Sequence, residues 1–208
     1  MTPIKRTVCQ LLLCSLLLAG CSQTAPVVQP APPPTPAAPA SATPTLELSA
    51  EQQQQFAQAK QLLMDGNASA ARRILQPLSV ALPQATGVAY NLALSQWHSA
   101  DIAAAQNTLS QLLSWAPLYS EGHNLAGVLA RQQGQFRQAE QHFLQALQAQ
   151  PDNAMAHKNL AFLYELYLGA PLQAHFHYKH YVELTQDEQA KVWLALLEQQ
   201  LAQEQNND

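Results

Sequence analysis

Three histidines near the C-terminal end, His175, His177 and His180, are the residues whose types and spacing most suggest chemistry. His177 and His180 are three residues apart and would share a helix face, close enough to bind one metal ion. His175 would point away from that pair, and no carboxylate or cysteine lies between them. The sequence shows no nucleophile motif, phosphate-binding glycine loop or pair of catalytic carboxylates. We therefore predict a protein that is not an enzyme and binds no metal or cofactor. A metal-binding or catalytic role around His177 and His180 is the less favoured alternative.

Cys21 is the other reactive side chain, and its surroundings indicate export and lipidation. Lys5 and Arg6 precede an apolar run, residues 8–18. The run is shorter than the ~20 residues that span a bilayer and is typical of a secretory signal. The next residues, Leu18-Ala19-Gly20-Cys21, resemble the lipobox of bacterial lipoproteins. The resemblance implies acylation of Cys21, and an ordinary cleavage site beside a small apolar residue is the alternative.

The lipobox resemblance also implies a location. Residues 1–20 would be removed as a signal peptide, together with Cys9 and Cys14. Several acyl chains on Cys21 would anchor the protein stably, where a single chain is only marginal. Ser22 stands where the sorting pattern of these lipoproteins has aspartate when they are retained at the inner membrane. We therefore expect a protein anchored by lipid to the outer membrane and facing the periplasm.

Residues 21–48 are expected to form a linker that begins at the lipidated cysteine. Between Ser22 and Leu46 eight prolines stand among small and polar residues, with no charge. Such a segment cannot bury a core and is predicted to be disordered. Proline-rich chain extends by about 3.1 Å per residue, so its ~25 residues would reach up to ~75 Å. A spacer is favoured over a ligand for a proline-recognising module, for which "PPPTP" is the candidate.

The remainder of the chain repeats at an interval of 34 residues. In each copy a small residue is expected where two helices pass closely, and a second small residue is followed four positions later by a bulky one on the same helix face. A unit of two short helices cannot bury its apolar face alone, so the copies must stack. A fourth copy slips by one residue at Gly169. The positions are Pro83, Pro117 and Pro151; Ala59, Ala93, Gly127 and Ala161; Ala71, Ala105 and Ala139; and Leu75, Leu109 and Phe143.

These residues resemble the tetratricopeptide repeat. The stretch that carries the resemblance is Asn124-Leu125-Ala126-Gly127, Gly134-Gln135-Phe136, Ala139, Phe143, Ala146 and Pro151. The resemblance implies an all-α solenoid of helix-turn-helix units over residues 49–186, with about four repeats, and a generic helical bundle is the alternative. The repeats would span residues 52–85, 86–119, 120–153 and 154–188.

A last helix is expected over residues 187–205. Thr185-Gln186-Asp187-Glu188 has the form of a capping box that would open this helix. An apolar stripe follows and would cover the open end of the last repeat. Recruitment of a partner helix is the alternative use of the stripe. It comprises Val192, Trp193, Leu196, Leu197 and Leu201.

Composition limits the class of partner. Without Lys5 and Arg6 the chain has eight basic and fourteen acidic residues, a net charge of −6, and no run of basic residues. Nucleic acid is therefore not an expected partner. In the solenoid that the resemblance implies, the first helices line a concave groove that binds proteins or peptides.

Thirteen side chains on the first helices are the predicted partner-binding residues. Asparagines among them would hydrogen-bond the backbone of an extended peptide, and aromatic rings would hold its side chains. In the alternative interpretation Asn91 and Asn159 only satisfy helix ends or neighbouring repeats, and the aromatic rings belong to the core. The thirteen are Phe56, Lys60, Tyr90, Asn91, Leu94, Trp97, Asn124, Val128, Arg131, Lys158, Asn159, Phe162 and Glu165.

The function that these patterns favour is that of an adaptor in the cell envelope. Lipoproteins of this size and layout in the family assist the assembly of pili and their secretin channels, and others are scaffolds for peptidoglycan enzymes or proteases. The resemblance therefore implies docking of envelope proteins in the groove, with pilus or secretin assembly first and the peptidoglycan scaffold second. The sequence does not identify the partner.

Replacing Cys21 by alanine tests the lipid anchor. Alanine offers no thiol for acylation, so an unlipidated precursor should accumulate and the protein should leave the outer-membrane fraction. Metabolic labelling with a fatty acid and membrane fractionation measure this, with Cys14→Ala as the matched control. Unchanged fractionation of Cys21→Ala would place the anchor elsewhere.

Overall fold

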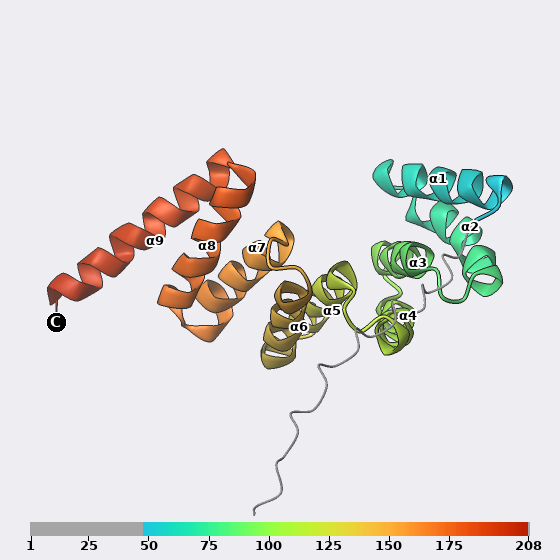
Figure 1. The fold of residues 1–208 in the computed structure, drawn as a ribbon. Helices are drawn as coiled ribbons and strands as arrows, with labels where there is room; N and C mark the ends of the chain where they lie inside the picture. The colour runs from blue at the N-terminus through green and yellow to red at the C-terminus, as the bar shows by residue number, and fades with distance from the viewer. Residues whose placement is uncertain (1–47, 208) are drawn as a thin grey trace, which may run out of the picture. The chain divides into compact units, whose positions relative to one another are not determined.

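The computed structural model describes residues 48–207 and shows a stack of antiparallel helices (Figure 1). The predictions for Cys21, the signal peptide and nearly all of the linker lie outside these residues. Within them there is no β-strand, and no helix is long and apolar enough to cross a membrane. The helices are α1 Ala50–Met64, α2 Ala68–Ala81, α3 Thr86–His98, α4 Ile102–Trp115, α5 Ser120–Gln132, α6 Phe136–Ala149, α7 Ala154–Leu163, the π-helix η1 Tyr164–Leu168, α8 Pro171–Thr185 and α9 Glu188–Asn207.

The predicted helix-turn-helix solenoid with a last capping helix is confirmed. Each first helix contacts its own second helix and also the first helix of the next unit. The buried side chains accordingly join neighbouring units. One apolar cluster runs from α1 to α3, a second from α3 to α5, and a third from α5 to α9. The core is therefore continuous along the stack, as expected when no single unit can bury its own apolar face.

The turns within the units share one backbone conformation. Gly66, Gly134 and Gly169 adopt φ of 75°, 74° and 60°, and Ala100 adopts φ 62° at the equivalent place. This left-handed region is free of strain only for glycine, so Ala100 is the costly member of the series. Polar side chains then begin the next helix, since Asp101 accepts a hydrogen bond from the backbone of Ala104.

The two helices of a unit approach most closely in the third repeat. A Cβ atom on Gly127 would lie 2.5 Å from the Phe143 ring, closer than any real contact. The equivalent small residues, Ala59, Ala93 and Ala161, are fully buried. In the first two units the opposing bulky residue is a leucine. The Phe143 ring therefore leaves no room for a side chain at position 127.

The one-residue slip of the fourth repeat is taken up by η1. Ala161 keeps the 34-residue interval from Gly127, whereas Gly169 follows Gly134 by 35 residues. The extra residue must lie between them, and the chain there winds as a π-helix, which is the usual way to insert one residue into a helix.

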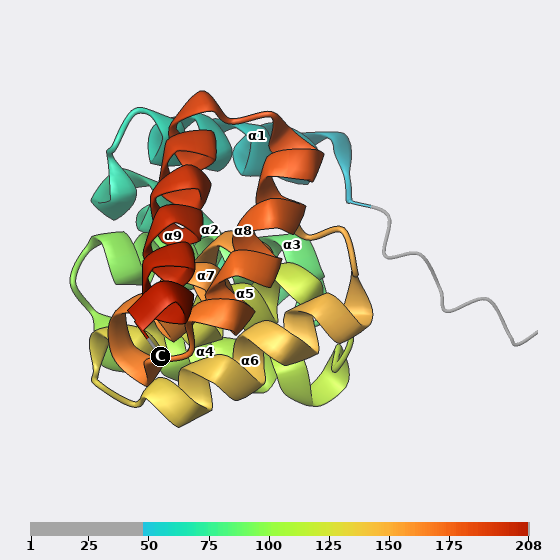
Figure 2. The same ribbon diagram turned by 90° about the vertical axis from the view of Figure 1, so that its left-hand side faces the viewer.

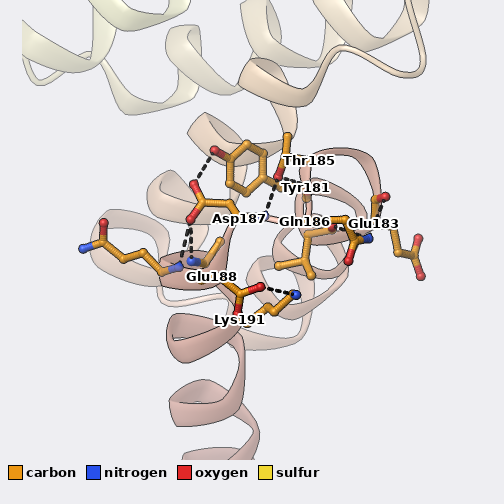
Figure 3. A network of polar contacts seen from close by, with 10 residues as sticks. Tyr181, Glu183, Thr185, Gln186, Asp187, Glu188 and Lys191 are labelled. Carbon is orange, nitrogen blue, oxygen red and sulfur yellow. Dashed lines mark hydrogen bonds and ion pairs between the residues drawn. The ribbon is translucent and has the colours of Figure 1, made fainter.

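The start of α9 differs from the prediction. Asp187, not Thr185, caps the helix, because its Oδ1 accepts hydrogen bonds from the backbone of Gln189 and Ala190 (Figure 3). Thr185 is the last residue of α8 and donates its hydroxyl to the carbonyl of Tyr181. Gln186 takes a left-handed conformation that ends α8. The sequence pattern of a capping box could not show that α8 extends this far.

Gly127→Ala tests the close approach of α5 and α6. The added methyl group must displace the Phe143 ring, which should lower the free energy of unfolding by about 1–3 kcal/mol. Chemical denaturation, monitored by circular dichroism, measures this change in the free energy of unfolding. The double variant Gly127→Ala/Phe143→Leu recreates the pairing of the first two repeats, so its loss should be smaller than the sum of the two single losses. Additive losses would contradict the contact.

Candidate protein-binding surface

The first helices lie next to one another along the stack, which brings the predicted residues into one series. α1 contacts α3, α3 contacts α5, and α5 contacts α7. Trp97 donates its indole N–H to Oε1 of Gln132, one repeat further on, at 2.9 Å. Tyr90 meets Tyr119 edge to face, with ring centroids 5.8 Å apart. The surface formed by α3 and α5 therefore carries aromatic rings that are only partly buried.

Two of the three predicted asparagines are occupied within the chain. Asn159 is buried and donates its amide to Oδ1 of Asn124 at 2.8 Å, which links neighbouring repeats. Asn91 donates to the carbonyl of Gly87 in its own helix at 2.7 Å. Asn124 is half-buried and serves only as the acceptor in its bond to Asn159. The amide N–H groups of Asn124 make no hydrogen bond among the described residues, so a ligand could still use them.

The N-terminal end of the series holds one aromatic residue and one cation. Phe56 packs in the cluster of the first unit, and Lys60 lies over its ring with Nζ 5.1 Å from the centroid. Lys60 is exposed. The ammonium group therefore covers one face of the ring, and the exposed Lys60 is the group at this end that a peptide could reach.

The C-terminal end is covered by α9, which runs beside α8 in front of α7 (Figure 2). Trp193 of α9 lies 5.1 Å from the ring of Phe162, and Nζ of Lys158 is 5.4 Å from the ring of Trp193. Glu165 is exposed, and its carboxylate accepts a hydrogen bond from the hydroxyl of Tyr178. Lys158 and Phe162 therefore contact the capping helix, and the accessible part of the surface is centred on α3 and α5.

Arg131 is the charged residue at this centre. Its Nε is shielded from solvent and has no hydrogen-bond partner among the described residues. The guanidinium has further N–H donors, which could bond a carboxylate or carbonyl of a partner. Val128 and Leu94 supply half-buried apolar area on the same two helices. The region thus combines aromatic rings, apolar area and a cationic donor, the composition that is enriched where proteins bind one another.

His177 is buried in the array rather than exposed on its surface. It is 7% exposed, and its Nδ1 lies 2.9 Å from Nδ1 of His157. Nε2 of His157 faces the carbonyl of Pro151 at 3.0 Å and must carry the proton, so Nδ1 of His157 accepts from His177. His157 lies 20 residues away in the sequence, so the spacing of His175, His177 and His180 did not indicate this contact. Among the described residues no group of three or more metal-ligating side chains is suitably placed for an ion.

The other two histidines of the cluster face acidic residues. His175 approaches Glu198 of α9 at 2.9 Å, and His180 approaches Glu183 at 3.5 Å. His175 therefore does point away from His177, as helix geometry predicted. Burial, followed by the charges of His157 and His180, lowers the pKa of His177 to about 4.

Three residues that make contacts between helices escaped the sequence analysis. Tyr119 immediately precedes α5, so it did not belong to a predicted first helix. Burial, and then the charge of Glu121, raise the pKa of its hydroxyl. Gln132 is one of many glutamines in the sequence, and its position alone did not indicate its hydrogen bond with Trp97. His123 repeats the arrangement of His157, with Nε2 donating to the carbonyl of Pro117 at 2.9 Å. The 34-residue spacing of these two histidines was the available signal.

Comparison with known proteins agrees with this architecture. Residues 90–153 and 124–166 match the tetratricopeptide repeat family model. The fold is a tetratricopeptide repeat solenoid. Protein–protein interaction is the general use of this fold. No curated protein matches the chain.

Solved structures resemble the array over most of its length. TTC0263, a thermophilic TPR protein of Thermus thermophilus, superposes with a TM-score of 0.62 and 22% identity over 72% of this chain and 82% of its own. The pilF structure of Pseudomonas aeruginosa gives 0.66 and 18% identity over 73% and 69%. MamA of Desulfovibrio magneticus gives 0.61 and 14% identity over 75% and 88%. Likenesses at these identities show the fold alone.

Acidification should destabilise the folded array. The folded chain keeps His177 neutral down to a pKa of about 4, whereas an unfolded histidine binds its proton near pH 6.5. The unfolded state therefore holds more protons between these values, so the stability is complete above pH 6.5 and falls as the pH drops towards 4. Burial also lowers the pKa values of His157 and His142, which adds to the loss of stability at low pH. Melting temperatures measured by circular dichroism across this range check the slope.

Two matched variants test whether His177 causes this dependence of the melting temperature on pH. His177→Asn removes the titrating group and keeps an amide donor for His157, so the melting temperature should vary less with pH. His98→Asn changes an exposed histidine at the end of α3 and should leave the slope unchanged. Equal slopes in His177→Asn and the unsubstituted chain would contradict the role of His177.

Proposed function

We propose that this protein is a non-enzymatic adaptor that binds a protein partner on the first-helix surface of its repeats. The observation that carries the proposal is the combination on α3 and α5 of half-buried aromatic rings with the half-buried guanidinium side chain of Arg131. An extended peptide or a helix of the partner would cover Tyr90 and Trp97 and offer an acceptor to Arg131. Aromatic and arginine side chains carry most of the binding free energy at such surfaces.

We infer the place of this surface in the cell from the N-terminal segment. Cys21 in the lipobox would hold the chain at the outer membrane, and the proline-rich linker would extend the array into the periplasm. The partner is then a protein of an envelope machine. The resemblance to pilus-assembly lipoproteins favours a component of a pilus or its secretin, and the likeness to the pilF structure is in keeping with this at the level of the fold.

Crosslinking in intact cells tests both the surface and the partner. A photoreactive amino acid at position 97 should capture a discrete envelope protein, which mass spectrometry identifies. The matched control places it at Gln111, an exposed residue of the second helix α4. Capture from position 111 and none from position 97 would contradict the proposed surface. Capture of a peptidoglycan enzyme would keep the surface and replace the pilus assignment.

Truncation of the central side chains should weaken the captured complex. Trp97→Ala and Arg131→Ala are each expected to raise the dissociation constant about tenfold or more, as central tryptophan and arginine residues do. Isothermal titration with the captured protein measures this, and the melting temperature of each variant verifies its fold. Gln111→Ala is the control and should bind as the unsubstituted protein does.

A further inference from the structure

A cavity of about 540 Å³ lies on the second-helix side of the array, between α4 and α6, with α5 as its floor. Leu109 and Leu113 of α4 and Ala126 and Ala130 of α5 form its apolar part. Exposed serines and glutamines of α4 and α6 line its rim, so the cavity is open to solvent. Its lining contains none of the thirteen predicted groove residues and no acidic, lysine or arginine side chain. It is therefore a site separate from the proposed surface.

The cavity exists because two positions of the third repeat carry alanine. The counterparts of Ala126, 34 residues away on each side, are Leu92 and Leu160, and both are buried. The counterpart of Ala130 in the next repeat is Tyr164, which is also buried. The larger side chains occupy the corresponding space in their own units. The cavity therefore results from two small side chains, Ala126 and Ala130, in a repeat that otherwise keeps the 34-residue interval.

In the next repeat the side chain of Tyr164 fills the corresponding space. The ring of Tyr164 stacks on the imidazole of His177, with centroids 5.7 Å apart and planes at 14°. Its hydroxyl donates to Oε1 of Glu140 at 2.8 Å. Burial and that hydrogen bond raise the pKa of Tyr164 to about 12, so the phenol stays protonated as a donor.

Both of these contacts have counterparts in the cavity wall. His142 corresponds to His177 once the extra residue of η1 is counted, and it sits beside His123 as His177 sits beside His157. Gln106 corresponds to Glu140 at the 34-residue interval. The amide N–H of Gln106 already donates to Gln133 at 2.8 Å, and its Oε1 accepts no hydrogen bond within the described residues. The stacking partner and the acceptor are therefore present, and the phenol ring is missing.

We propose that this cavity receives a tyrosine side chain presented by a partner polypeptide. The ring lies over His142 and against Ala126 and Ala130, and the hydroxyl donates to Oε1 of Gln106. An engineered cavity of about 150 Å³ already holds benzene, so this larger cavity also has room for backbone on either side of the ring. The rim serines and glutamines offer hydrogen bonds to that backbone, and the uncharged lining favours a neutral phenol over a charged side chain.

Titration of the full chain in detergent micelles with N-acetyl-tyrosinamide tests this site. Methyl signals of Ala126 and Ala130 and imidazole signals of His142 should shift saturably in nuclear magnetic resonance spectra. N-acetyl-phenylalaninamide lacks the donated hydroxyl and should bind about twofold to tenfold more weakly. N-acetyl-alaninamide should cause no shift at these residues.

Filling the cavity from within provides the decisive variant. Ala130→Tyr places the chain's own ring where Tyr164 lies in the next repeat, so it should abolish probe binding. Ala103→Tyr adds the same side chain at an exposed position of α4 and should leave binding unchanged. Should Ala130→Tyr fail to fold, His142→Ala removes the stacking partner and should weaken binding about threefold to tenfold.

Three results would overturn the proposal. The first is no saturable shift with the tyrosine probe in the unsubstituted chain. The second is binding that survives in folded Ala130→Tyr or is unaffected by His142→Ala. The third is binding of p-cresol, the free side-chain analogue, without binding of N-acetyl-tyrosinamide, which would make the cavity a site for small phenols. None of these results bears on the first-helix surface.

Discussion

The close approach of the two helices within each unit is the constraint on which the rest of the structure depends. Fully buried small residues at a 34-residue interval let the helices pass, and one bulky side chain from the second helix closes each contact. Where that side chain is Phe143, even a methyl group at Gly127 would be too large. Because each hairpin is packed in this way, it presents the same apolar flank to its neighbour, and the stack follows.

Departures from this interval are where the array acquires individual features. The extra residue in the fourth repeat is absorbed as a π-helix, and Tyr164 at its start fills the space between two units. Ala126 and Ala130 leave the corresponding space of the preceding repeat open. The histidine pairs, by contrast, keep the interval. His123 and His157, 34 residues apart, each tie a first helix to the carbonyl of the proline that ends the previous unit.

The capping helix decides how much of the first-helix surface remains accessible. Its Trp193 packs on Phe162 and under the cation of Lys158, so the last repeat is partly closed. The accessible part of this surface is thereby centred on α3 and α5, where Trp97 and Arg131 lie. The proposed cavity site on the second-helix side shares no lining residue with this surface.

The sequence by itself determined the repeat, its register and the all-α solenoid, because a 34-residue interval of small and bulky residues is a local pattern that one packing arrangement satisfies. It also located the slip at Gly169. Only the tertiary structure decided which first-helix residues are used internally, since the Asn124–Asn159 bond and the burial of His177 by His157 join residues 35 and 20 positions apart. The extension of α8 to Thr185 and the cover provided by Trp193 likewise depend on contacts between helices. Such contacts have no periodic signal in the sequence, because each is made once and by side chains whose types are common on helix surfaces.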